Sequence, residues 1–204
     1  MKIILSAIAI SLFVTGCATA AMQTDTGKML VARLEEDFSS KGPATMERML
    51  NQDEVQKACS AYPLDMPDEQ MEALQASQLK TVKYPADGNY LGVWKEGEKI
   101  AQNGRGMQSS DQVKGTNGGN CYACHQLAKE EISFGNIGPS LYRYGKLKGD
   151  GEAVVKYTWA KIYNSQAFTA CSNMPRFGHS GILTEKQIKD VMALLFDKNS
   201  PVNQ

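Results

Sequence analysis

A short cysteine motif near the middle of the chain, Cys121-Tyr122-Ala123-Cys124-His125, restricts the possible fold and chemistry more than any other segment. Cys-x-x-Cys-His is the attachment signature of c-type haem. Each thiol can form a thioether with one vinyl group of the porphyrin, and the adjacent histidine then binds the iron as its proximal ligand. The motif therefore predicts one covalently bound haem c, held by Cys121 and Cys124 and ligated by His125.

The first residues of the chain have the features of a secretory signal. Met1-Lys2 supplies one positive charge, residues 3–14 form an apolar run broken only by serines and alanines, and residues 15–18 are small. The apolar run is shorter than the roughly 20 residues of a transmembrane helix. The protein is therefore expected to be exported.

Two processing outcomes are open for this signal. Val14-Thr15-Gly16-Cys17 resembles a lipoprotein box, which would end the signal at residue 16 and leave Cys17 as a lipid-linked N-terminus. Ala18-Thr19-Ala20 instead fits the small-x-small site of ordinary signal peptidase, which would end a signal peptide at residue 20. Association with a membrane is expected only if Cys17 is lipidated.

Other interpretations of the cysteine motif account for less of the sequence. A zinc site needs a second ligand pair at suitable spacing, whereas Cys59 and Cys171 are isolated. A redox dithiol usually lies in a βαβ unit, which the sequence does not indicate. A chance match would have to coincide with an export signal, a following histidine and glycine-rich flanks. Haem attachment explains all of these features together.

A sixth iron ligand has to come from another part of the chain. Met174 lies in a proline-containing loop, where a rigid turn could present its sulfur, and a thioether opposite a histidine raises the reduction potential. His179 is the alternative ligand, and Met174 could also be one of several methionines that pack in the core. The carbonyl of Pro139 is the candidate acceptor for the second ring nitrogen of His125.

Cys59 and Cys171 are the remaining two of the five cysteines. An oxidising compartment favours a disulfide between them. The bridge would tie the N-terminal part of the chain to the loop three residues before Met174. Two buried free thiols are the alternative.

Apolar residues recur at helical spacing along much of the chain, and no segment shows the alternation of a strand. The fold is therefore expected to be mainly α, with a helical extension over residues 21–87 and a haem-binding domain over residues 88–204. Thr184 and Gln187 have the spacing of a capping box at the start of the last helix. The other expected helices lie within residues 29–38, 43–55, 67–79, 93–100 and 154–162, and glycine-rich loops within residues 103–120 and 134–151.

The charge balance excludes one class of partner and disfavours another. Lys and Arg together number 22, and Asp and Glu together also number 22. Nucleic-acid binding needs a concentrated basic face, so no nucleic-acid partner is expected. Transient electron shuttles generally rely on charge steering, so the balanced sequence favours a stable, apolar interface with a partner.

Four segments of the chain carry a family resemblance: they run from Gly118 to Gln126, from Ile132 to Leu141, from Cys171 to Gly178 and from Ile182 to Glu185. Together they resemble the SoxX family, the small monohaem cytochrome c subunit of the SoxAX complex in bacterial sulfur oxidation. The resemblance covers about residues 88–204 and implies a class I cytochrome c-like domain. It also implies His125 and Met174 as the axial ligands, with Cys121 and Cys124 as the thioether links.

The same resemblance implies a function in the periplasm, as a heterodimer with a SoxA-type cytochrome. That complex joins thiosulfate oxidatively to a cysteine of the SoxYZ carrier protein, a reaction of the L-cysteine S-thiosulfotransferase type. The sulfur chemistry belongs to the SoxA-type haem, so the SoxX-type subunit would carry electrons to a soluble cytochrome and have no catalytic residue of its own. A free-standing periplasmic electron shuttle is the alternative function. A gas sensor is disfavoured because Met174 would fill the open position on the iron.

Overall fold

The structure is a computed structural model that describes residues 15–61 and 65–204, with side chains described from residue 26 onward. Most of the predicted signal, residues 1–14, lies outside the described residues. The side chain of Cys17 also lies outside them, so the prediction of its lipidation is not addressed by the structure.

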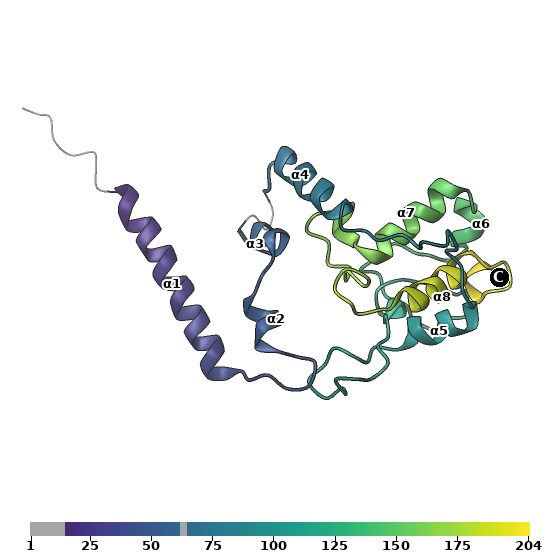
Figure 1. Cartoon of the computed structure of the whole chain (residues 1–204), viewed down its shortest axis with the longest axis horizontal. Helices are drawn as coiled ribbons and strands as arrows, with labels where there is room; N and C mark the ends of the chain where they lie inside the picture. The colour runs from purple at the N-terminus through teal and green to yellow at the C-terminus, as the bar shows by residue number, and fades with distance from the viewer. Residues whose placement is uncertain (1–14, 62–64) are drawn as a thin grey trace, which may run out of the picture.

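The described ranges fold into α-helices and short 3-10 helices with no β-strand, which confirms the mainly α prediction (Figure 1). Among these residues, no helix is both long enough and apolar enough to cross a membrane. The helices are α1 (Thr15–Asp37), α2 (Met46–Leu50), α3 (Glu54–Ala61), α4 (Asp68–Leu79), α5 (Trp94–Gln102), α6 (Tyr144–Lys148), α7 (Glu152–Tyr163) and α8 (Glu185–Phe196), with 3-10 helices η1 (Cys121–Ala123), η2 (Ser165–Ala167) and η3 (Pro201–Asn203).

Helices α5 and α8 form the most extensive helix contact of the described structure. A Cβ atom added to Gly97 would lie under 3.0 Å from the backbone of Asp190, so only glycine permits this approach of the two helices. Helix α8 begins at the predicted capping box, in which Thr184 and Gln187 exchange side-chain to backbone hydrogen bonds. Its buried face then lines the main core, which also contains Leu127 and Trp159.

Helix α7 links this core to the segment that precedes α5. The Trp159 side chain is fully buried, and its Nε1 donates a hydrogen bond of 2.9 Å to the carbonyl of Lys83. The ring of Tyr90 packs edge-on against Trp159, with 5.6 Å between the ring centroids. The chain between α4 and α5 is therefore packed along α7.

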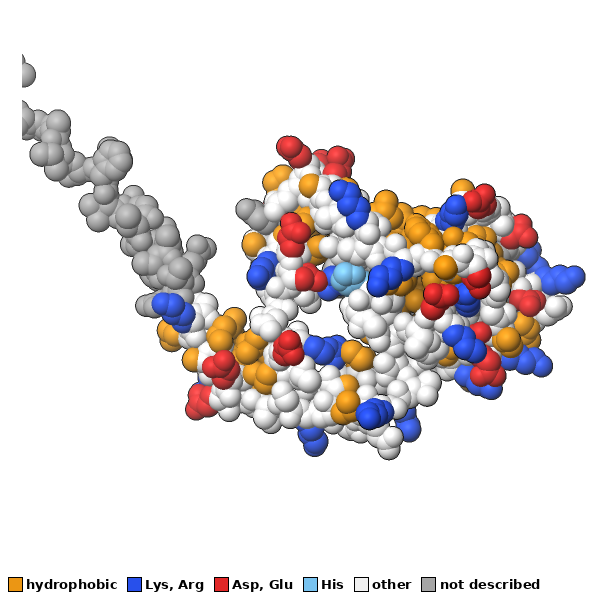
Figure 2. All heavy atoms as spheres, in the orientation of Figure 1, with side chains coloured by type: hydrophobic (Ala, Val, Ile, Leu, Met, Phe, Trp, Pro, Cys, Tyr) orange, Lys and Arg blue, Asp and Glu red, His pale blue; other side chains and the backbone are white. Residues whose placement is uncertain are grey.

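The N-terminal helices differ from one another in how they join this body. Helices α3 and α4 contribute to a second, smaller core, which consists of Val55, Met66, Leu74 and Ala170. Helix α1 instead extends away from the body (Figure 1). Figure 2 shows hydrophobic side chains at the surface of its C-terminal half, where Met29 and Leu30 are exposed.

One predicted helix is wrong in its extent. Residues 43–55 were expected to form a single helix, but α2 ends at Leu50 and α3 begins at Glu54. Asp53 separates the two helices because its carboxylate accepts a hydrogen bond from the Gln56 backbone N–H, while the Gln56 side chain accepts one from the Asp53 N–H. This reciprocal cap starts a new helix instead of continuing the old one.

Candidate functional site

The cysteine motif begins on the single turn η1. Asn120, which precedes the turn, has a left-handed backbone conformation with φ 49°. The backbone N–H groups of Cys124 and His125 both donate to the carbonyl of Cys121, at 3.1 and 2.9 Å. The turn thus places the two cysteines and the histidine one after another on a compact stretch of backbone.

The four described cysteines divide into one bonded pair and one free pair. Cys59 and Cys171 form a disulfide with a Cα–Cα distance of 5.5 Å, which confirms the predicted bridge. Cys121 and Cys124 are free thiols. The disulfide also occupies the two cysteines that a zinc site at the motif would need. Within the described residues, no group of three or more His, Cys, Asp or Glu side chains is arranged to hold a metal ion.

The Cys121 thiol lacks the electrostatics of a reactive cysteine. Burial raises the pKa of the Cys121 thiol to about 12. Cysteines that exchange disulfides instead have lowered pKa values, since the thiolate is the attacking species. Cys121 is therefore poorly suited to act as the attacking thiolate of a disulfide exchange.

His125 is oriented by the loop that follows the motif. Its Nδ1 lies 2.7 Å from the carbonyl oxygen of Pro139, the acceptor named from the sequence. With Nδ1 donating to this carbonyl, Nε2 is the ring nitrogen left to bind a metal. This is the arrangement that a haem-ligating histidine requires, so the residues of the motif fit a c-type haem.

Two glycines let this loop pack directly against the motif. A Cβ atom on Gly138 would lie within 3.0 Å of three ring atoms of His125, and one on Gly135 would lie within 3.0 Å of the Ala123 carbonyl. The backbone N–H of Gly138 donates to the Cys124 carbonyl at 2.8 Å. The loop therefore confines the imidazole through backbone contacts that no larger residue would allow.

Met174 lies in the loop between η2 and α8, with its backbone held on both sides. Its N–H donates to the Ser172 hydroxyl at 3.1 Å, and its carbonyl accepts a hydrogen bond of 2.5 Å from the Ser165 hydroxyl. The side chains of Met174 and Cys121 both pack against the main core cluster. The fold thus brings the predicted distal ligand and the motif to the same core.

His179, the alternative ligand, is engaged elsewhere. Its Nδ1 lies 3.2 Å from the Thr81 hydroxyl, at the end of α4. Burial and the neighbouring Arg176 guanidinium lower the pKa of His179, against the opposing effect of Asp53. This contact ties His179 to Thr81, just after α4.

No protein-family model matches the chain. The chain is 37% identical over 207 residues to an uncharacterised lipoprotein of Aquifex aeolicus (strain VF5). The chain belongs to the family of this lipoprotein. The alignment covers 98% of both chains, so the helical extension and the segment that carries the cysteine motif both lie within the length shared by this family.

Sequence reasoning missed two residues that help to hold the loop around Met174. Ser165 and Asn164 are fully buried. The Ser165 hydroxyl donates a hydrogen bond to the Met174 carbonyl, and the Asn164 side chain donates one to the Gln78 side chain. Neither residue lies in a recognisable motif, and neither bonds to a residue that is adjacent in the sequence. No local signal could have identified them.

Proposed function

We propose that this lipoprotein-family member is a monohaem c-type cytochrome, and that it serves as the SoxX-like subunit of a thiosulfate-oxidising complex. The observation that carries the proposal is the hydrogen bond of 2.7 Å between His125 Nδ1 and the Pro139 carbonyl. His125 directly follows two free cysteines that have the spacing of haem attachment. The resemblance of residues 88–204 to SoxX supports the assignment to sulfur oxidation.

In this proposal each site residue has a defined task. Cys121 and Cys124 would hold the haem through two thioether links, and His125 and Met174 would bind its iron. The bound haem supplies a one-electron carrier. The Pro139 carbonyl accepts a hydrogen bond from Nδ1–H, which fixes the tautomer of His125 and strengthens its donation through Nε2. The thioether of Met174 favours the reduced state.

The reaction served by the complex is a two-electron oxidation. The terminal sulfur of thiosulfate and the thiol of a SoxYZ cysteine form one S–S bond, with release of the thiol proton and two electrons. The bond forms on the SoxA-type partner. The present chain accepts the electrons one at a time and passes them to a soluble cytochrome.

We also infer that the chain is exported and carries lipid on Cys17. The relative that covers nearly the whole chain is named a lipoprotein, and Val14-Thr15-Gly16-Cys17 resembles a lipoprotein box. The disulfide between Cys59 and Cys171 suits an oxidising compartment such as the periplasm. Mass spectrometry of the native N-terminal peptide tests the inference: an acylated Cys17 supports it, and an unmodified peptide beginning at Ala21 overturns it.

The haem assignment is tested by expressing the full chain with the haem-attachment machinery. Covalent haem that survives denaturing electrophoresis is expected, and its loss is expected in the double variant Cys121→Ser, Cys124→Ser. The matched control is the double variant Cys59→Ser, Cys171→Ser, which should keep covalent haem because these cysteines lie in the disulfide. Equal haem content in all three proteins would refute the assignment.

The assignment to sulfur oxidation is tested by purification from the native host. A second cytochrome in stoichiometric amount, together with reduction of this chain by thiosulfate in the presence of the carrier protein, is expected. A monomeric cytochrome that thiosulfate does not reduce would instead identify a free-standing electron shuttle.

A further inference from the structure

We propose that α3 and α4 act as a brace that positions Met174. The brace is residues 53–61 and 65–83, and the methionine loop is residues 164–179. The inference rests on the proposed function, because it takes Met174 as the iron ligand. It assigns a task to an extension that the resemblance to SoxX leaves unexplained: the extension limits the freedom of the loop from which the sulfur is presented.

A covalent tie joins the brace to the loop just before Met174. Cys59 of α3 is bonded to Cys171, which lies three residues before the methionine. Ala170, the neighbour of Cys171, is fully buried and packs in the same cluster as Val55 of α3. This part of the methionine loop is therefore built into the core of the extension.

A buried polar tie runs from α4 to the backbone of Met174. The side-chain Nδ2 of Asn164 donates to Gln78 Oε1 at 3.0 Å and to Thr81 Oγ1 at 2.9 Å, and Asn164 is fully buried. The next residue, Ser165, donates from its hydroxyl to the Met174 carbonyl at 2.5 Å. A displacement of α4 would leave buried polar groups without partners, which is unfavourable.

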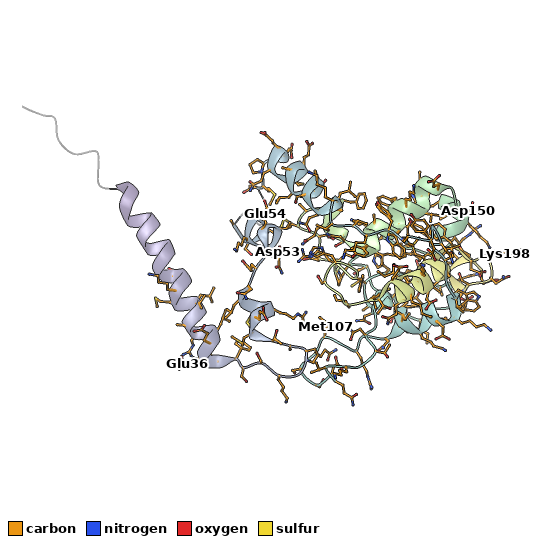
Figure 3. The ribbon with its side chains drawn as sticks, viewed as in Figure 1. Glu36, Asp53, Glu54, Met107, Asp150 and Lys198 are labelled. Atoms are coloured by element: carbon orange, nitrogen blue, oxygen red, sulfur yellow. A yellow bond between two sulfur atoms is a disulfide. The ribbon has the colours of Figure 1, made fainter. Side chains whose placement is uncertain are left out.

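An ionic tie holds the loop on the other side of Met174. Arg176 Nη1 lies 2.6 Å from a carboxylate oxygen of Asp53, and only 12% of the Arg176 side chain is exposed. Asp53 lies where the chain enters α3 (Figure 3). His179 adds a contact with Thr81 at the end of α4. The brace thus grips the loop both before and after the ligand.

Two contacts hold the loop before Met174, and two hold it after Met174, so the loop is restrained on both sides of the methionine. A ligand on an unrestrained loop can dissociate from the iron when the loop moves. A ligand on a restrained loop can dissociate only after one of the restraining contacts breaks. The brace is therefore expected to slow the dissociation of the Met174 sulfur. Haem attachment through Cys121 and Cys124 should not depend on it.

The test compares two Asp→Asn variants of the full haem-loaded protein. Asp53→Asn weakens the ionic tie to Arg176. Asp87→Asn is the matched control. It weakens an ion pair of 3.0 Å to Lys189 of α8, which is distant in sequence and does not involve the methionine loop. The measurement is the rate at which imidazole replaces the methionine, followed by loss of the sulfur-to-iron charge-transfer band of the ferric protein.

The rate is expected to rise about tenfold in Asp53→Asn, because the largely buried Arg176 guanidinium loses its carboxylate partner, and to change less than about twofold in Asp87→Asn. The double variant Cys59→Ser, Cys171→Ser should raise the rate further. If that variant does not fold, Asp53→Asn decides alone. Equal rates in Asp53→Asn, Asp87→Asn and the wild type would overturn the brace and leave the proposed function intact. A wild-type protein without covalent haem, or without the charge-transfer band, would overturn the brace together with the role given to Met174.

Discussion

Replacement of Gly138 by alanine is expected to disturb the histidine site directly. The added Cβ would lie within 3.0 Å of Cε1, Nδ1 and Nε2 of His125, although ordinary van der Waals contact begins at about 3.4 Å. Either the ring or the loop therefore has to move, and the Nδ1 hydrogen bond to Pro139 is weakened. Overpacking of this kind costs about 1–3 kcal/mol, and the weakened hydrogen bond adds about 1 kcal/mol.

A small gain in the unfolded state partly offsets this loss. Alanine has fewer backbone conformations to lose than glycine, which stabilises by roughly 0.4–1 kcal/mol. The net expectation is a decrease of about 1–3 kcal/mol in the free energy of unfolding. Urea denaturation of the full-length protein, followed by circular dichroism and by the fluorescence of the buried Trp159, measures this decrease.

Gly27→Ala is the matched control for this substitution. A Cβ atom on Gly27 meets nothing within 4 Å, and the residue lies inside α1. Alanine at this position is expected to leave the unfolding of the body unchanged. The weaker donation from a displaced His125 should also raise the reduction potential of Gly138→Ala but not of Gly27→Ala. Equal unfolding free energies and equal potentials in the two variants would show that the packing of Gly138 against His125 has no energetic importance.

Three further outcomes follow from the described contacts. Removal of the disulfide in Cys59→Ser, Cys171→Ser is expected to cost about 2–4 kcal/mol, because the bridge closes a loop with a sequence separation of 112 residues; urea unfolding that is the same with and without a reductant would contradict this. Gly97→Ala is expected to lower the melting temperature by several degrees, since its Cβ would meet the Asp190 backbone and push α5 from α8; an unchanged melting temperature would show that the helices adjust freely. Burial alone raises the pKa of Asp53, but hydrogen bonds from the Gln56 backbone and from Arg176 outweigh it and hold the pKa below its ordinary 3.8. The stability that Asp53 contributes is therefore present above about pH 4 and lost as the pH falls through the folded pKa; the difference in unfolding free energy between wild type and Asp53→Asn should shrink in acid, and a difference independent of pH would contradict the assignment.

Local rules predicted many of the helices well. The capping box of Thr184 and Gln187 is present, and the helix expected within residues 67–79 is α4, Asp68–Leu79. These features depend on residues three or four positions apart, so the sequence contains all of their causes. The disulfide between Cys59 and Cys171, predicted because an oxidising compartment favours pairing, is also present.

The errors of local reasoning have physical causes as well. The division between α2 and α3 depends on the side chain of Asp53 turning back onto Gln56, an alternative that helical periodicity does not reveal. Helix α6 lies within a segment expected to be a glycine-rich loop. Its Gly145 packs closely against the backbone of Leu195 and Phe196, so this short helix depends on a contact with α8.

The haem site could be predicted from the chain alone because the Cys-x-x-Cys-His signature consists of residues that are close together in sequence. The export signal could be predicted for the same reason. The contacts that support this site could not be predicted from the sequence. Asn164 meets Gln78, Arg176 meets Asp53 and Gly138 meets the ring of His125 only after the chain has closed into its tertiary structure. Contacts between distant residues depend on the positions of whole helices, and this is why the tertiary structure alone placed the extension beside the methionine loop.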